Sequence, residues 1–315
     1  WYVILLQLPG RTNHIPRAGS TPWLPGVHVH GTSLMRYLLL IALLLPTIVV
    51  AEPLRVFVSV LPLQTFVDKI GGEHVDVHTM VRPGYNPATY DPTPKQISAL
   101  AKASLYVRIG VPIEHAWMER IRSASPQMQV LDVRAGIELR DMENHRLGHD
   151  GHDESDPHVW TSPQLAIQMV GLIRDRLSEL DPAHRAEYAR NHDAYVRELE
   201  TLDQEIRALL DPLSHRKFLV FHPSWGYFAD TYGLIQVSIE NEGKEPGARA
   251  LATLIDQARL ERIRIVFLQP QFDRRQARQV ARAIDGEVIA VDPLAPDYAD
   301  NLRRVARQFA EALKP

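Results

Sequence analysis

Four side chains that could bind a cation occur at the ends of apolar, strand-like runs in the second half of the chain. They are His222, Glu240, Gln269 and Asp292. Ligands of open parallel sheets bind beyond the carboxyl ends of the strands, so these side chains are expected to converge on one edge of the same sheet. The pattern therefore predicts a cation site at that edge.

A further candidate, His158, lies in the sequence Asp-Pro-His-Val-Trp at 156–160, just before a predicted helix. There Pro157 would fix the approach of the chain, and Trp160 could shield a site from water. Two imidazoles and a carboxylate suit zinc, which accepts N and O donors at ~2.0–2.2 Å in a tetrahedron. The chain contains no cysteine, so thiolate ligands are excluded. The expected metal ligands are His158, His222, Asp292 and Glu240.

Each of these residues also has a structural alternative. A histidine at the end of a buried strand can be a hydrogen-bonded core residue. Asp292 precedes a proline, and Asp-Pro commonly opens a turn that the aspartate caps. Glu240 could instead be solvated, or paired with Lys244 or Arg249.

Eight short runs rich in β-branched residues predict strands, and helical patterns lie between them. Strands that alternate with helices form parallel sheets. We therefore expect an α/β fold with two lobes, each with a four-stranded, mainly parallel sheet flanked by helices. The predicted strands are residues 55–60, 75–81, 105–109, 130–133, 217–221, 235–240, 264–268 and 287–291.

A long helical region separates the two sets of strands. One helix is predicted to begin at Pro163 and to stop at Asp181-Pro182. A second pattern then runs from 183 to 210, about 28 residues or ~42 Å at 1.5 Å per residue. A helix of this length would join the lobes as a rigid strut, so only a small hinge motion is expected.

The first 51 residues are expected to lie outside the folded part. Residues 1–34 have neither helical nor strand periodicity and are interpreted as spurious upstream translation. Residues 35–51 have a basic start, an apolar run and a small-residue ending, which predicts a signal peptide cleaved after Ala51. A membrane anchor is the alternative, but a spanning helix needs ~20 apolar residues. The predicted parts of the mature chain are an N-terminal lobe at 52–182, a linking helix at 183–211 and a C-terminal lobe at 212–315.

The net charge argues against one class of partner, and the other histidines are given separate interpretations. A net charge of −3 without a block of Lys or Arg argues against nucleic-acid binding. The segment 141–156 is rich in His and Asp, and is either a solvated surface loop or a loop that captures zinc transiently through His145, His149 and His152. The remaining histidines of the predicted mature chain are interpreted as surface or core residues: His74, His78, His115, His184, His192 and His215.

Six short motifs, spread over the whole mature chain, resemble those of the zinc- and manganese-binding periplasmic receptors of ABC importers. They are Pro-Gly-x-x-Pro-x-x-Tyr at 83–90, Asp-Pro-His-x-Trp at 156–160, Phe-His-x-x-x-Gly-Tyr-Phe at 221–228, Pro-Gly-Ala at 246–248, Pro-Gln-Phe at 270–272 and Asp-Pro-Leu at 292–294. The resemblance implies two α/β lobes joined by a rigid helix, with a metal ion held between them by His158, His222 and Asp292.

One position departs from that family. Receptors of this kind usually have a histidine where this chain has Ala88, and an alanine cannot bind a metal ion. The fourth position is then open to Glu240, to a neighbouring Tyr85, Tyr90 or Asp91, or to water.

The chain is therefore expected to be a periplasmic receptor without enzymatic activity. It is expected to be soluble, because no cysteine follows the signal peptide for lipid attachment. A receptor that presents both lobes to a transporter is most simply a monomer. The receptor would bind Zn²⁺, or Mn²⁺ as the alternative, and deliver the ion to the permease subunits of an ABC importer in the inner membrane. An exported zinc hydrolase is a competing hypothesis, but the sequence has no His-Glu-x-x-His helix and no clear general base. A metal-dependent adhesin or chaperone on the same fold is a third.

Overall fold

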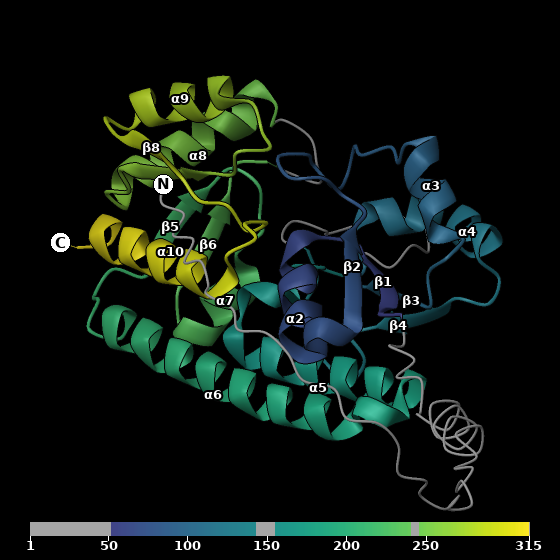
Figure 1. Ribbon diagram of the computed structural model, residues 1–315. Helices are drawn as coiled ribbons and strands as arrows, with labels where there is room; N and C mark the ends of the chain where they lie inside the picture. Colours follow the sequence, from purple (N-terminus) through teal and green to yellow (C-terminus); the bar gives the residue numbers. More distant parts are fainter. Residues whose placement is uncertain (1–51, 143–154, 241–245, 315) are drawn as a thin grey trace, which may run out of the picture. The chain divides into compact units, whose positions relative to one another are not determined.

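The computed structural model describes residues 52–142, 155–240 and 246–314 (Figure 1). Residues from Glu52 onward form one compact unit. The expected upstream segment, the expected signal peptide and the three loop histidines 145, 149 and 152 lie outside the described residues. No helix within the described ranges is long and apolar enough to cross a membrane.

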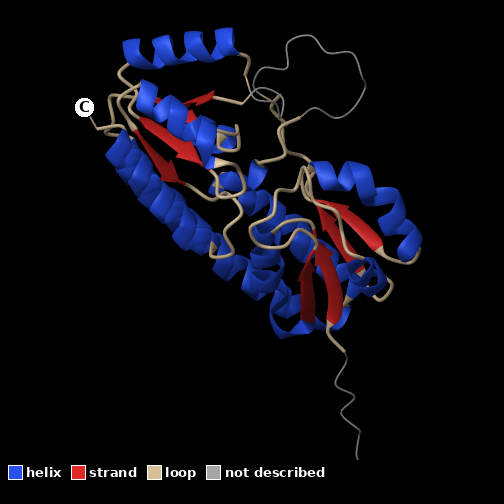
Figure 2. Ribbon diagram, turned by 90° about the horizontal axis from the view of Figure 1, so that it is seen from above, coloured by secondary structure: helices blue, strands red, loops and turns tan. Residues whose placement is uncertain are grey.

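Two four-stranded sheets form the frame, and Figure 2 shows them as two separate groups of arrows. Their strand orders are β2-β1-β3-β4 and β6-β5-β7-β8, and every strand pair is parallel. The predicted fold class is therefore confirmed. The strands are β1 (Leu54–Val58), β2 (Val75–Thr79), β3 (Leu105–Arg108), β4 (Gln129–Asp132), β5 (Lys217–Val220), β6 (Ile235–Ser238), β7 (Ile265–Leu268) and β8 (Glu287–Ala290).

Helices connect successive strands and cover the sheets. In the first lobe these are α2 (Leu61–Gly71), the 3₁₀ turn η1 (Gly72–His74), α3 (Pro94–Leu100) and α4 (Pro112–Ala124). In the second lobe they are α7 (Gly226–Tyr232), α8 (Ala248–Leu260), α9 (Arg274–Ala283) and α10 (Tyr298–Ala312). The chain that connects the two lobes contains, in order, η2 (Val159–Thr161), α5 (Pro163–Leu180), η3 (Pro182–His184) and α6 (Arg185–Leu210).

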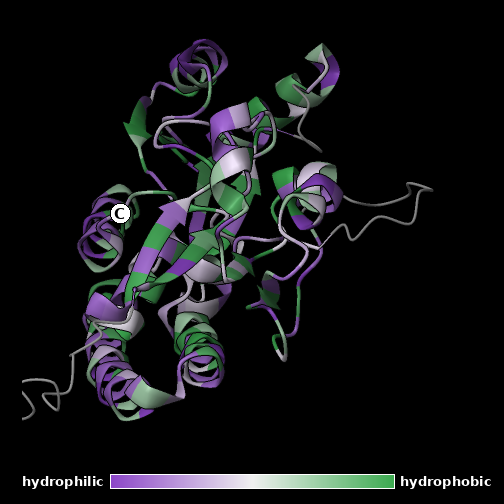
Figure 3. Cartoon of the chain, turned by 45° about the vertical axis from the view of Figure 1, so that its right-hand side comes forward, coloured by the Kyte–Doolittle hydropathy of each residue, from purple (hydrophilic) through white to green (hydrophobic). Residues whose placement is uncertain are grey.

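The central strands β1, β3, β5 and β7 are mostly apolar, as expected for parallel strands covered by helices on both faces. In β1, Val56, Phe57 and Val58 are all at most 2% exposed, and Val266 and Phe267 of β7 are fully buried. Figure 3 shows hydrophobic and hydrophilic stretches on both the strands and the helices. Each sheet is thus a buried, rigid support for the loops at its carboxyl edge.

Helix α6 is the longest element, with 26 residues. It packs against α2 of the first lobe, against α5 and against α10 of the second lobe. Its buried residues include Tyr188, Tyr195, Leu199, Leu202 and Ile206, at spacings of three, four and seven. The helix begins two residues later than the pattern predicts, because residues 182–184 form the 3₁₀ turn η3.

Candidate metal centre

A cavity of about 500 Å³ lies between the two lobes, at the carboxyl edges of their sheets. The first lobe lines it with the loops that follow β2 and β3 and with the first turns of α4. The opposite wall comes from the segment before α5 and from the loops after β5, β7 and β8. The residues on that opposite wall are Pro157, His158, Trp160, His222, Ser224, Gln269, Gln271, Phe272, Pro293 and Leu294.

His158 is held by a buried carboxylate. Its Nδ1 lies 2.7 Å from Oδ1 of Asp156, and the same oxygen accepts the backbone N–H of His158 at 2.9 Å. Asp156 is 2% exposed and His158 is 9% exposed. Burial lowers the pKa of His158 below its usual value, although the charge of Asp156 opposes that shift. The ring is therefore kept in its neutral form, which is the form that binds metal ions.

His222 has the same arrangement. Its Nδ1 lies 2.7 Å from Oε2 of Glu240, which is 6% exposed. Gln269 fixes the backbone, because its Nε2 donates to the carbonyl of His222 at 2.6 Å and its Oε1 accepts the backbone N–H at 3.3 Å. Phe272 stacks on the imidazole, with ring centroids 4.9 Å apart. Glu240, predicted as a ligand, thus contacts Nδ1 of His222 and is not among the residues that line the cavity.

The two imidazoles meet edge to face, with centroids 5.3 Å apart and an interplanar angle of 73°. Each Nδ1 faces a carboxylate, which leaves Nε2 of each ring free to bind an ion. Metal-binding histidines commonly have this second partner, since it fixes the tautomer and the ring orientation and raises the basicity of the binding nitrogen. The pair is therefore preorganised for a metal such as zinc.

Asp292 lies two residues after β8, at the carboxyl edge of the sheet where the sequence predicts it. Its Oδ1 accepts hydrogen bonds from the backbone N–H of Leu294 and from Nε2 of Gln271, both at 2.9 Å. This oxygen therefore caps the Asp-Pro turn, the structural alternative for this residue. Among the described residues that line the cavity, neither Asp292 nor the alternatives Tyr85, Tyr90 and Asp91 occurs. The hydroxyl of Tyr90 is instead bonded to Gln96.

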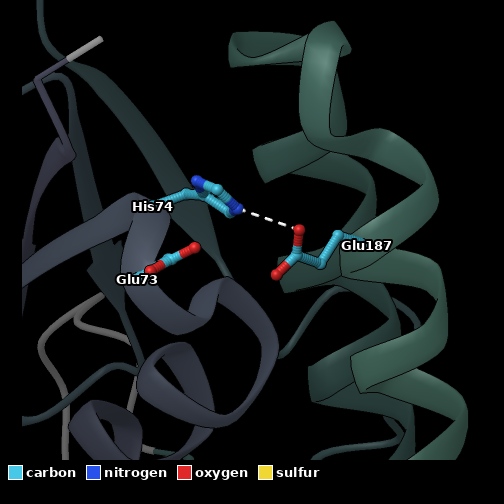
Figure 4. Close-up of side chains that lie close together, drawn as sticks. All are labelled: Glu73, His74 and Glu187. Atoms are coloured by element: carbon cyan, nitrogen blue, oxygen red, sulfur yellow. Dashed lines mark ion pairs between the residues drawn. The ribbon is translucent and has the colours of Figure 1, made fainter. Parts of the chain in front are cut away.

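The predicted ligands do not form a closed site. Across the described ranges, one group of three His, Asp or Glu side chains has ligand atoms all within 4.8 Å of one another, and it consists of Glu73, His74 and Glu187. Figure 4 shows His74 pointing from η1 toward Glu187 on α6, with Nε2 and Oε2 3.0 Å apart. This ion pair ties the first lobe to α6. No three of His158, His222, Asp292 and Glu240 have ligand atoms that all lie within 4.8 Å of one another in the described structure.

The segment that carries His158 is hydrogen-bonded to the second lobe. Tyr227 donates a hydrogen bond to the carbonyl of Asp156 at 3.0 Å. The indole of Trp160 donates to the carbonyl of Pro293 at 2.8 Å, and Tyr298 donates to the carbonyl of Trp160 at 2.7 Å. Both imidazoles therefore belong to the same wall of the cavity.

A comparison with known protein families shows the family to which this chain belongs. Residues 56–312 match the family model described as "ZnuA: Zinc-uptake complex component A periplasmic". The chain belongs to the ZnuA family. A crystal structure of ZnuA is 40% identical, with a TM-score of 0.80, and the match covers 84% of this chain and all of that one. A zinc-bound ZnuA mutant lacking residues 138–173 of its own sequence is also 40% identical, with a TM-score of 0.79, and covers 84% and 99% of the two chains.

A more distant relative is also named for zinc binding. The zinc-binding lipoprotein AdcA of Streptococcus pneumoniae is 26% identical over 251 residues, which is 76% of this chain. This chain spans about half of the length of that relative, 50%. The resemblance predicted from the six motifs is confirmed by the ZnuA family match.

Sequence reasoning missed three features of this site. Asp156 and Glu240 each lie 2.7 Å from Nδ1 of a cavity histidine, and Gln269 holds the backbone of His222. His115, interpreted as a surface or core residue, lines the cavity from the first lobe. The Asp-Pro-His motif itself contains the signal for Asp156, since a carboxylate two residues before a histidine can reach its Nδ1.

Proposed function

We propose that this chain is a periplasmic receptor that binds one divalent transition metal ion between its lobes and delivers it to the permease subunits of an ABC importer. Zinc is the proposed ion, with manganese as the alternative. The observation that carries the proposal is the pair of buried carboxylates, each 2.7 Å from Nδ1 of a cavity histidine, in a chain of the ZnuA family.

In this proposal His158 and His222 bind the ion through Nε2, and Asp292 adds a carboxylate oxygen when the site closes. Glu240 orients His222, as Asp156 orients His158. Neutral imidazoles and a carboxylate match the N and O preference of zinc. The chain binds and releases its ion without catalysing a reaction and acts as a monomer after cleavage of the signal peptide.

Zinc uptake by cells tests the delivery step. Deletion of the gene in its own host should lower the uptake of radioactive zinc when the medium is depleted by a chelator. The wild-type gene should restore uptake, whereas a His158→Ala, His222→Ala double variant exported at the same level should not. Uptake that is unaffected by the deletion, or restored equally by the double variant, would contradict the proposed function.

A further inference from the structure

We propose that His115 supplies the metal ligand of the first lobe, the position left open by Ala88. This inference rests on the proposed function, because it concerns the same cavity. The wall of the first lobe is formed by residues 86–88, 110–112 and 115–116. Among these described residues, only His115 has an imidazole, and none has a carboxylate. Its side chain is exposed and lies in the first turns of α4.

The need for such a ligand follows from where the other two imidazoles lie. His222 follows β5, and the hydrogen bonds of Tyr227 and Tyr298 attach the segment of His158 to the same lobe. An ion held by those two residues alone would touch one lobe. A ligand can favour a closed state only if it makes contacts there that the open state lacks. An ion that draws the lobes together therefore requires a binding group on the opposite wall.

The turn before His115 is unusually well fixed. Glu114 is fully buried, and its carboxylate accepts the backbone N–H groups of Ile109 at 2.8 Å and Gly110 at 2.7 Å. It also accepts a hydrogen bond from Nε of Arg108 at 3.0 Å. A buried carboxylate with this many donors locks the loop after β3 to the start of α4. The next residue, His115, is thus presented to the cavity from a rigid support.

Position 88 lines the same wall as His115. Ala88 and His115 both line the cavity, but only His115 has a side-chain nitrogen that could bind an ion. The first lobe could therefore supply an imidazole from either position. A histidine introduced at position 88 should take over the role of His115.

The test is a zinc titration of the metal-stripped protein, with a chelator of known affinity as competitor. His115→Ala should weaken zinc binding by about 100-fold or more, since loss of an orienting partner alone costs roughly 10–100-fold. X-ray absorption of the zinc complex should show one imidazole fewer. His215→Ala, which removes another exposed histidine that does not line the cavity, should change neither result.

Rescue separates a ligand from a merely structural residue. Adding Ala88→His to His115→Ala should restore the affinity and the imidazole count, and His115→Gln should behave like His115→Ala. If His115→Ala binds zinc as the wild type does, with the same imidazole count, while His158→Ala and His222→Ala lose binding, the receptor function stands and this inference is overturned. A wild-type protein that binds no zinc would overturn both.

Discussion

Two carboxylates decide which nitrogen of each cavity histidine is free. Asp156 and Glu240 are almost fully buried, and a carboxylate oxygen of each accepts a hydrogen bond from Nδ1–H of its histidine. The sequence predicted His158 and His222 at the cavity, because motif and strand-end position place them there. It could not distinguish a carboxylate that binds the ion from one that binds the imidazole. That distinction depends on side-chain directions across β5 and β6, which the order of residues does not contain.

Replacing Glu240 separates these two roles. Glu240→Gln should weaken zinc binding roughly 10–100-fold, because a neutral amide polarises the imidazole of His222 less than a carboxylate does. The number of zinc ligands, measured by X-ray absorption, should not change. Glu261→Gln, which alters a carboxylate paired with Lys217 on the second lobe, is the control. Loss of an oxygen ligand from zinc in Glu240→Gln would show that Glu240 binds the ion directly.

At the scale of elements, the strands were predicted within two residues, mostly with an overrun at their carboxyl ends. Val60, Val81 and Ile239 are apolar and buried but follow the last strand residue. The extended backbone continues there, as the hydrogen bond from Val81 N–H to the carbonyl of Ser59 shows. These overruns are the start of the loops that form the cavity, and periodicity alone does not separate a buried loop start from a strand.

The corner between α5 and α6 is held by Asp181. Its Oδ2 accepts a hydrogen bond from the hydroxyl of Tyr188 at 2.7 Å and lies 2.5 Å from Nδ1 of His184. Burial alone would raise the pKa of Asp181, but the bonds from Tyr188 and His184 outweigh it and hold the pKa below its usual value. The ionised carboxylate thus stabilises the junction from which α6 starts.

Asp181→Asn should lower the free energy of unfolding by about 1–2 kcal/mol at pH 7, as expected for hydrogen bonds to a charged group. A carboxylate whose pKa is lower in the folded state stabilises the protein above its unfolded pKa of ~3.9 and loses this effect as the pH falls further. The difference between wild type and variant should therefore shrink below pH ~4 in urea unfolding. Asp256→Asn, at a position where the carboxylate is 80% exposed, is the control. If wild type and Asp181→Asn differed in unfolding free energy by the same amount at pH 7 and below pH ~4, this account would be contradicted.

Glu114 should be among the most important polar residues of the first lobe. Glu114→Ala leaves the buried N–H groups of Ile109 and Gly110 without their acceptor, and each such group costs roughly 1–3 kcal/mol. Unfolding by urea should show a loss of about 3 kcal/mol or more. Glu119→Ala, on the exposed side of the same helix, should have little effect. A small loss for Glu114→Ala would show that the turn is held by other contacts.

At the scale of the whole molecule, one hydrophobic core runs through both lobes. It includes Val56 of β1, Leu199 of α6 and Phe309 of α10. Because α6 contributes to this core and packs against both lobes, bending at the junction would break buried contacts. The sequence predicted the strut from the length of the pattern. It did not predict that residues 156–160 attach to the second lobe, since the donors Tyr227 and Tyr298 lie 71 and 138 residues from their acceptors.

The motion that accompanies binding should therefore be small. Small-angle X-ray scattering of the metal-free and the zinc-saturated protein should give radii of gyration that agree within experimental error, because the strut allows only local closure of the cavity. A clear contraction on adding zinc would indicate a flexible hinge and would contradict the role of α6 as a strut.

The central claim is that His158 and His222 together hold the metal ion. The most direct test is calorimetric titration of zinc into the metal-stripped protein, beside His158→Ala, His222→Ala and the control His215→Ala. We predict one zinc ion per chain for the wild type and the control, and loss of that binding in both cavity variants. Tight binding that survives both cavity substitutions would contradict the claim and place the metal site elsewhere in the chain.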